Sequence, residues 1–149
     1  MNNVILINGP NLNLLGKREN EIYGNLSLEE IKEMSISKSE ELNIKLKFVQ
    51  SNSESEIIDL IHSTENSYDA LIINPAGFTH TSVAILDALR AITKPKIEIH
   101  LSNIYDREDF RNKSITANGV QGLICGFGYL SYLLAIEGVY RILKNNKKD

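Results

Sequence analysis

The sequence predicts an α/β fold in which one open sheet of five parallel strands carries helices on both faces. Short runs of apolar, largely β-branched residues alternate with longer amphipathic segments, which is the pattern of repeated strand–helix units. The apolar runs are continuous, as expected of parallel strands that are buried on both faces. Four of these runs stop at a polar cluster, and ligands of such sheets bind beyond the carboxyl ends of the strands.

The first two strands flank a helix with a clear start signal. Val4–Ile7 is a short apolar run and is predicted to form the first strand. Ser27 is followed three residues later by Glu30, a capping-box pattern that predicts a helix ending near Leu42. Leu46–Val49 is the second predicted strand.

The middle of the chain repeats this arrangement. Ser53 and Glu56 form a second capping-box pattern, and the helix that follows has an apolar stripe made by Ile57, Ile58, Leu60 and Ile61. Ala70–Ile73 is the third predicted strand, and Ser82 to Ile92 the third helix.

The last third of the chain completes the sheet. Lys96–Leu101 and Gly122–Cys125 are the fourth and fifth predicted strands, and a long helix from Phe127 to Lys144 has the basic end that suits the helix dipole. Asn145–Asp149 is expected to be a frayed tail. Strand–helix alternation favours right-handed crossovers, so we predict a flavodoxin-like, doubly wound sheet with the strand order 2-1-3-4-5.

Composition describes one ordinary globular domain spanning residues 1–149, with 42% hydrophobic and 23% charged residues. The net charge of -3 gives no electrostatic reason to expect nucleic acid or an anionic membrane as a partner. No apolar run approaches the ~18 residues of a membrane span. The first strand begins too early in the chain for a signal peptide to precede it.

The single cysteine, Cys125, rules out an internal disulfide and fits the reducing cytoplasm, where we expect the protein to reside. It lies in an apolar stretch between Gly122 and Gly126. We therefore expect a buried, inert thiol and not a nucleophile.

Polar side chains at two predicted strand ends indicate a ligand site. Asn74 and His80 follow the third strand, and Glu98 and His100 lie inside the otherwise apolar fourth strand. A polar side chain within a doubly buried strand is costly unless it is paired. Glu98 and His100 are therefore either functional groups or a structural buried pair.

Two connections are longer than the fold requires. Gly9 to Asn25 separates the first strand from the first helix, and long connections in compact domains are often functional lids. This stretch has the composition of a lid that closes on an anionic ligand, although a surface loop with incidental charges is the alternative. It carries Asn11, Asn13, Arg18, Glu19 and Tyr23 among its polar side chains. The second insert, Ser102 to Asn118, contains Arg107 and Arg111.

Familiar cofactor and metal motifs are absent from the sequence. It has no GxGxxG, no GxxxxGK[ST], no HExxH and no CxxC. His80, His100 and Glu98 lack the spacing of an open metal site. We therefore predict no cofactor and no metal.

Five blocks, in this order and spacing, resemble the type II 3-dehydroquinate dehydratases: GPNLNLLG at Gly9–Gly16 with Arg18-Glu19 and Tyr23-Gly24, NPAGFTHTS at Asn74–Ser82, EIHLSN at Glu98–Asn103, REDFR at Arg107–Arg111, and GFGY at Gly126–Tyr129. The resemblance covers essentially the whole chain. It implies a cofactor-free lyase that dehydrates 3-dehydroquinate to 3-dehydroshikimate, the third step of the shikimate pathway, by anti elimination through an enolate.

The resemblance also implies catalytic roles. Tyr23 is the base, and because a phenol has a pKa near ~10, the neighbouring Arg18 is the candidate cation that lowers it. Asn74 stabilises the enolate, through a bound water. His100 protonates the leaving hydroxyl, and Glu98 orients or polarises it.

Substrate-binding roles follow from the same likeness. They fall on Asn11, His80, Arg111 and the backbone amides around Leu101 and Ser102. Arg111 suits a carboxylate because its planar fork pairs bidentately. From the sequence alone, His80 and His100 could exchange roles, since both sit at strand ends.

The family is a dodecamer, a tetramer of trimers, in which the aspartate at Asp87 reaches a neighbouring subunit's site. From the residues alone, Asp87 could simply pair with Arg90 on the same helix.

Two positions depart from the family pattern, with Asn112 where a histidine is expected and Ser131 where a glycine is expected. Neither carries an assigned chemical role.

Two other functions stay open at this point, a different lyase or hydrolase with an anionic substrate and a flavodoxin-like binding or receiver module. A receiver module needs acidic residues at the ends of the first and third strands, where this chain has Asn8 and Asn74.

The type I enzymes, which catalyse the same dehydration, use a Schiff-base lysine on a barrel fold. Lys96 begins its strand at the opposite edge of the sheet, so we reject a covalent imine mechanism.

Overall fold

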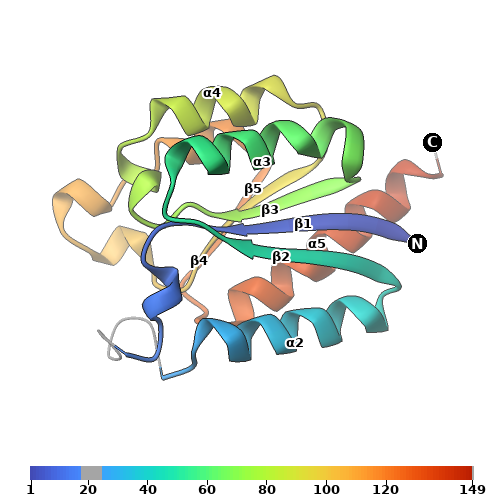
Figure 1. The fold of residues 1–149 in the computed structure, drawn as a ribbon, viewed down its shortest axis with the longest axis horizontal. Coiled ribbons are helices and arrows are strands. Elements are labelled where there is room, and N and C mark those ends of the chain that lie inside the picture. Colours follow the sequence, from blue (N-terminus) through green and yellow to red (C-terminus); the bar gives the residue numbers. More distant parts are fainter. Residues whose placement is uncertain (18–24, 149) are drawn as a thin grey trace.

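The computed structural model describes residues 1–17 and 25–148, and the five strands within them form one parallel sheet in the order β2-β1-β3-β4-β5. This is the predicted flavodoxin-like order (Figure 1). The strands are β1 (Asn2–Asn8), β2 (Ile44–Gln50), β3 (Ala70–Asn74), β4 (Lys96–His100) and β5 (Gly122–Cys125).

Helices cover both faces of the sheet, as predicted, with two on each face in the described part of the chain. The helices α2 (Leu28–Glu41) and α5 (Leu130–Asn146) lie on one face, and α3 (Glu54–Ser67) and α4 (Val83–Ala91) on the other (Figure 1). Successive residues of a strand point to opposite faces, so each strand contributes to two cores. Val4 and Leu6 of β1, for example, pack toward α2 and α5, whereas Ile5 and Ile7 pack toward α3 and α4.

Side-chain caps define where the helices begin. Ser27 Oγ accepts a hydrogen bond from Glu30 N at 3.1 Å, and the Glu30 carboxylate accepts one from Ser27 N, so this capping box is complete. Ser53 Oγ accepts from Glu56 N at 3.2 Å. Among the described residues the return bond from Ser53 N to the Glu56 carboxylate is not formed, so the second predicted box is only half present.

The predicted start of the last helix was three residues too early. Gly126 and Gly128 have φ values of 94° and 59°, which a right-handed helix does not allow, and α5 begins only at Leu130. The helix then continues to Asn146, two residues into the expected frayed tail. Ser131, where the family pattern has glycine, is buried, and its Oγ accepts a hydrogen bond from Phe127 N at 3.3 Å.

The expectation of a buried thiol was wrong. Cys125 is partly exposed because it ends β5, an edge strand whose only paired neighbour among the described strands is β4. By contrast, Lys96 is buried at the amino end of β4, where its Nζ donates to the Ile92 carbonyl oxygen at 2.7 Å. Burial lowers the pKa of this amine.

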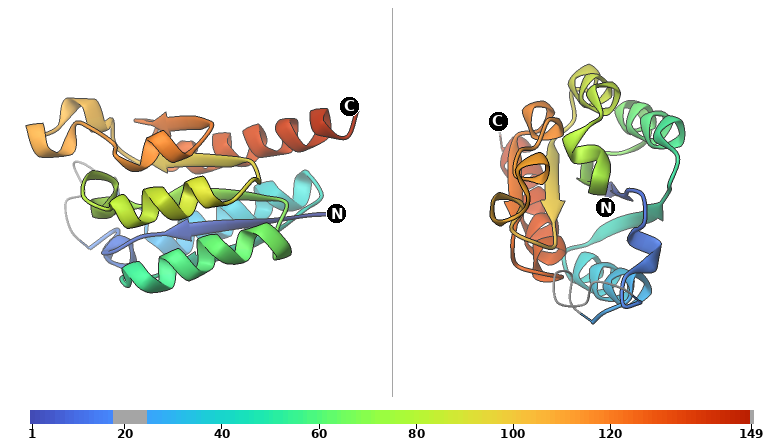
Figure 2. Two further views of the ribbon diagram at one scale, coloured as in Figure 1. Left: turned by 90° about the horizontal axis from the view of Figure 1, so that it is seen from above. Right: turned by 90° about the vertical axis from the view of Figure 1, so that its left-hand side faces the viewer.

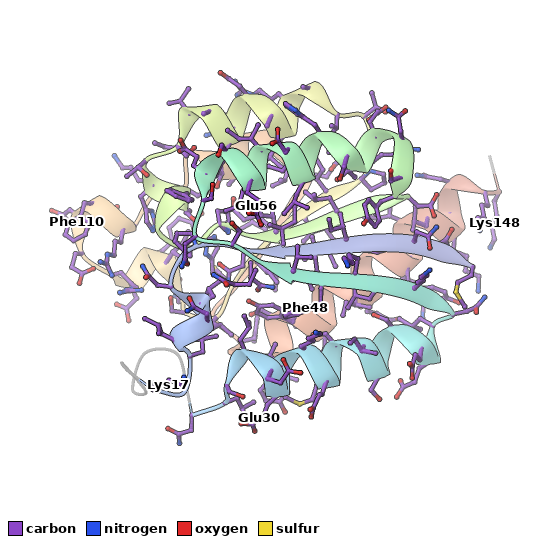
Figure 3. The ribbon with its side chains drawn as sticks, in the orientation of Figure 1. Lys17, Glu30, Phe48, Glu56, Phe110 and Lys148 are labelled. Atoms are coloured by element: carbon purple, nitrogen blue, oxygen red, sulfur yellow. The ribbon has the colours of Figure 1, made fainter. Side chains whose placement is uncertain are left out.

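The loops after the strands collect at the end of the molecule opposite the two termini (Figure 2). They contain short 3₁₀ helices, namely η1 (Leu12–Leu14), η2 (Ala76–His80), η3 (Ile104–Asp106), η4 (Asp109–Arg111) and η5 (Thr116–Gly119). Lys17 and Phe110 lie at this end, and Lys148 lies at the other (Figure 3). Within the residues that the structure describes, no helix is long and apolar enough to cross a membrane.

Candidate active site

A cleft lies beyond the carboxyl ends of the strands, next to the point where the winding of the sheet reverses. β1 and β3 are neighbours, but the chain leaves β1 toward β2 on one side and leaves β3 toward β4 on the other. Ligands of doubly wound sheets bind at such a switch point because the two loops diverge there. Residues from the loops after β1, β3 and β4 line the cleft.

The loop after β1 is held against the loop after β3 by a close backbone approach. Gly9 N donates to the Asn74 carbonyl oxygen at 2.8 Å. A Cβ atom at Gly9 would lie 2.5 Å from the Pro75 carbonyl oxygen, so only glycine fits here. The next residue but one, Asn11, lines the cleft with a left-handed φ of 69°, and its N–H donates to Asn52 Oδ1 at 3.0 Å.

Asn74 ends β3 and belongs to a buried chain of hydrogen bonds. Its Oδ1 accepts from Ala76 N at 3.1 Å, and its Nδ2 donates to the Tyr132 hydroxyl at 3.0 Å. Tyr132 donates in turn to Asn8 Oδ1 at 2.6 Å, and Asn8 Nδ2 donates to the Val49 carbonyl oxygen at 2.9 Å. Burial raises the pKa of Tyr132, so its hydroxyl keeps its proton as a donor.

Glu98 and His100 are in contact on one face of β4, as the sequence suggested. His100 Nε2 lies 2.9 Å from Glu98 Oε2, and both side chains are buried. The Glu98 carboxylate also accepts a 2.7 Å hydrogen bond from Ser114 Oγ and another from Thr116 Oγ1. These donors compensate the burial of a carboxylate in the sheet.

His80 has a different kind of partner. It ends η2, six residues beyond β3, and its Nδ1 donates to the Lys113 carbonyl oxygen at 2.7 Å. In a neutral ring this bond leaves Nε2 as an acceptor. Both histidines line the cleft, but only His100 contacts a buried carboxylate, so the structure distinguishes two positions that the sequence left interchangeable.

The loop after β4 supplies the cationic side of the cleft. Leu101 and Ser102 line it directly after the strand, and Arg107 and Arg111 line it further along. The Arg111 side chain is 38% exposed, and its Nε lies 3.6 Å from Glu108 Oε2. Such an exposed guanidinium is available to an anionic ligand.

The remaining predicted residues are Arg18, Glu19, Tyr23 and Asp87. Arg18, Glu19 and Tyr23 are outside the described residues. Asp87 is exposed on α4 and is not among the described residues that line the cleft. Within the described part of the chain, it forms no ion pair with Arg90, so the alternative that the sequence left open, a simple intrahelical pair, is not formed.

No group of three or more histidine, cysteine, aspartate or glutamate side chains that could hold a metal ion occurs in residues 1–17 and 25–148. The buried Glu98 carboxylate is instead surrounded by the three hydrogen-bond donors described above. These contacts are typical of an anion held in place by protein groups.

The family model described as dehydroquinase class II matches residues 2–140 of the chain. The chain belongs to this family. It is 52% identical over 147 residues to a 3-dehydroquinate dehydratase of Clostridium botulinum (strain Okra / Type B1), covering 99% of this chain and 100% of the relative. It is 53% identical over 139 residues to a 3-dehydroquinate dehydratase of Thermoanaerobacter pseudethanolicus, covering 93% and 94%.

Solved structures of the family have the same fold as this chain. A type II dehydroquinase from Butyrivibrio crossotus superposes with a TM-score of 0.90 at 42% identity, covering 92% of this chain and 96% of that one. A type II dehydroquinase from Propionibacterium acnes gives a TM-score of 0.92 at 35% identity, covering 95% and 97%. The family and the fold that the sequence motifs suggested are thus confirmed.

Sequence reasoning missed four polar residues that support the candidate site from behind the cleft. Ser114 lies in an irregular segment and Thr116 begins the short helix η5, and no periodic pattern marks them as partners of Glu98. Asn8 was noted only as a strand end, and Tyr132 lies in an apolar helix segment and looks like an ordinary core aromatic. The one available signal was that a buried tyrosine hydroxyl needs a polar partner.

Proposed function

We propose that this chain is a type II 3-dehydroquinate dehydratase, which converts 3-dehydroquinate to 3-dehydroshikimate in the third step of the shikimate pathway. The observation that carries the proposal is the Glu98–His100 pair at the cleft, an acid candidate with a buried anionic partner. The curated relatives named 3-dehydroquinate dehydratase support the choice of substrate. The reaction is an anti elimination through an enolate and uses no Schiff base.

The first step removes a proton α to the ketone of the substrate. Tyr23 is the proposed base, and the cation of Arg18 favours its phenolate form. Both residues are assigned by the motif resemblance, since they lie outside the described residues. The electron pair of the broken C–H bond moves onto the ketone oxygen and gives the enolate.

Asn74 is the proposed group that stabilises the enolate, through a bound water. One Nδ2 hydrogen of Asn74 is used by Tyr132, and the second has no partner among the described residues. Because Asn74 lines the cleft, this second hydrogen is available for a developing oxyanion or for a water that contacts it. The buried amide needs no reorganisation as charge develops.

His100 is the proposed acid of the second step. The enolate collapses, the C–O bond to the β-hydroxyl breaks, and the hydroxyl takes a proton from His100 and leaves as water. The Glu98 carboxylate, whose Oε2 lies 2.9 Å from His100 Nε2, presents a negative charge to the ring and fixes its orientation. The carbonyl partner of His80 presents no such charge, which supports His100 as the acid.

The substrate is anionic, and its carboxylate is assigned to Arg111, whose planar fork can donate two parallel hydrogen bonds. Asn11, His80 and the backbone amides around Leu101 and Ser102 are assigned to the substrate hydroxyls and the carboxylate. The acceptor Nε2 that remains on His80 fits a hydroxyl donor. We therefore expect Arg111→Ala to weaken substrate binding about tenfold or more, which corresponds to the loss of one hydrogen bond to a charged group.

The proposal includes the assembly and location that the resemblance implies, a cytoplasmic dodecamer arranged as a tetramer of trimers. In it, Asp87 of one subunit reaches the cleft of the next. The exposed position of Asp87 on α4, away from its own cleft, supports a role at a subunit contact.

Ultraviolet absorbance during incubation with 3-dehydroquinate and a chelator tests the function. We expect the absorbance of the conjugated enone to grow with the native chain, and growth to be nearly abolished by Tyr23→Phe. The control is Tyr105→Phe, which removes a hydroxyl from a tyrosine that is 60% exposed and should leave the rate unchanged. If the absorbance grows with the native chain and with both variants, a residue other than Tyr23 is the base. If it does not grow with the native chain, the substrate assignment is refuted.

A further inference from the structure

We infer that Tyr132, supported by Asn8, is a positioning residue that fixes the side-chain amide of Asn74 so that it presents an N–H donor to the cleft. The inference rests on the proposed function, in which Asn74 stabilises an oxyanion. It adds two residues, neither of which lines the cleft, to the machinery of the reaction.

The three side chains meet because of the sheet register and the face that each strand turns to α5. Asn8 and Asn74 are the last residues of neighbouring strands and are direct partners in the register of β1 and β3. Leu6 and Ile72, two residues earlier in these strands, pack in the core beneath α5, so Asn8 and Asn74 share that face of the sheet. Tyr132 lies in the first turn of that helix. Its hydroxyl bridges the two asparagines.

The direction of the hydrogen bonds is set by a backbone group at each end of the chain. At one end the Val49 carbonyl can only accept, so Asn8 must turn Nδ2 toward it and Oδ1 toward Tyr132. The Tyr132 hydroxyl must then donate to Asn8, and its oxygen accepts from Asn74 Nδ2.

At the other end, the Ala76 N–H can only donate, so Asn74 Oδ1 must face it. The two ends therefore require the same orientation of the Asn74 amide. If the Asn74 amide were flipped, its Nδ2 would face the Ala76 N–H, and two donors would oppose each other. Its Oδ1 would then face Tyr132, whose hydroxyl would have one hydrogen for two acceptors.

The network is buried, which makes a wrong orientation costly. Asn8 and Tyr132 are 0% exposed, and Asn74 is 3% exposed. Unpaired polar groups in such surroundings lose their hydrogen bonds without replacement by water. Burial also raises the pKa of Tyr132, so the hydroxyl remains a donor throughout the working pH range. Since Tyr132 uses one Nδ2 hydrogen, the donor that Asn74 has left for a ligand is the second Nδ2 hydrogen.

A double-mutant cycle on kcat tests the inference, with Tyr132→Phe made in the native chain and in Asn74→Ala. Tyr132→Phe keeps the ring, whose centroid lies 6.2 Å from that of Phe48, and removes only the hydroxyl. We expect kcat to fall about tenfold or more while KM changes less than about twofold, because a misplaced group weakens the transition state more than substrate binding. In Asn74→Ala, the same substitution should leave kcat within about twofold, because its effect passes through Asn74.

The matched control is Tyr140→Phe, which removes a hydroxyl from another tyrosine of α5 whose partner is Lys144 and should leave kcat unchanged. Asn8→Ala is a second variant, which frees Tyr132 from donating to Asn8 and should lower kcat in the native chain but not in Asn74→Ala. An equal fall of kcat in both backgrounds would show a general structural effect and overturn the inference. An unchanged kcat in Tyr132→Phe would also overturn it.

The crystal structure of Tyr132→Phe separates this inference from the proposed function. We expect the Asn74 amide to turn or shift relative to Ala76, whatever the substrate is. An Asn74 side chain that keeps its place without the hydroxyl would refute the positioning role. If the native chain does not convert 3-dehydroquinate, the proposed function fails, and this structural comparison still decides the role of Tyr132.

Discussion

The side chains of Glu98 and His100 lie side by side on one face of β4, with Oε2 of the first 2.9 Å from Nε2 of the second. Residues two apart in a strand share a face, so the strand itself brings the pair together. Ser114 and Thr116 complete the carboxylate's hydrogen bonds from the segment that precedes β5. The Glu98 carboxylate, fixed by these two hydroxyl groups, in turn fixes the His100 ring at the cleft.

Replacing the carboxylate should weaken the acid without removing it. We expect Glu98→Gln to lower kcat about a hundredfold, because the neutral amide no longer presents a negative charge to the ring of His100. Steady-state kinetics of enone formation measures this, with Glu33→Gln as an exposed control. In His100→Asn, adding Glu98→Gln should cost little more, and a full additional loss would show that Glu98 acts independently of His100.

Thr116 should matter for stability through the same carboxylate. Thr116→Val removes a hydroxyl that donates to buried Glu98, and we expect the free energy of unfolding to fall by about 1–3 kcal/mol. Thr116→Ser keeps the hydroxyl and should recover most of this loss. Urea unfolding of the three proteins gives the comparison. A loss in Thr116→Ser as large as that in Thr116→Val would argue against the hydroxyl as the source of the effect, because only the valine variant lacks it.

The fold could be predicted because its determinants are local. The cap at Ser27, the apolar runs and the handedness of strand–helix–strand units specify the helices, the strands and their order. The Glu98–His100 contact could also be anticipated, since a polar pair in a buried strand must find partners. The contact of Tyr132 with Asn8 joins residues 124 positions apart, and only the folded sheet shows which buried hydroxyl meets which strand end.

Glu65 should make stability depend on pH. Its carboxylate accepts hydrogen bonds from the Thr93 hydroxyl at 2.6 Å and from Thr93 N at 2.8 Å, and these lower the pKa of Glu65. A lowered folded-state pKa stabilises the protein above the unfolded-state pKa of ~4.3, and this stabilisation is lost as the pH falls through the folded-state value.

Glu65→Gln should therefore be less stable than the native chain at pH 7, and the difference should shrink as the pH falls below about 4. Urea unfolding at a series of pH values, with Glu33→Gln as the control, measures the difference. A difference that stays constant from pH 7 to pH 3 would argue against the Thr93 hydrogen bonds as its source.

Gly9 should be intolerant of any side chain. An alanine Cβ would lie 2.5 Å from the Pro75 carbonyl oxygen and 2.7 Å from its carbon, and these backbone atoms cannot rotate away. We expect Gly9→Ala to lose about 2 kcal/mol or more of stability and most of its activity, because the loops that hold Asn11 and Asn74 are pushed apart. Thermal unfolding and kinetics measure both effects. Gly122→Ala is the control, since its Cβ would meet nothing within 4 Å among the described residues.

The proposed role of Asp87 in a neighbouring cleft can be tested by mixing two inactive proteins. His100→Asn lacks the acid, and Asp87→Ala lacks the group donated to the neighbour. A mixed assembly contains some clefts with His100 from one subunit and Asp87 from the next, so refolding the two variants together should restore part of the activity.

The matched control mixes His100→Asn with Asn74→Ala. Both of these side chains line the cleft of their own subunit, so every cleft in the mixture lacks either His100 or Asn74. No activity should therefore return. Mass photometry of each mixture checks that the assemblies form and gives their size, for which we expect a dodecamer. Activity that fails to return in correctly assembled mixtures of the Asp87 and His100 variants would confine Asp87 to its own subunit, because a residue that acts across a contact must be replaceable from the other side.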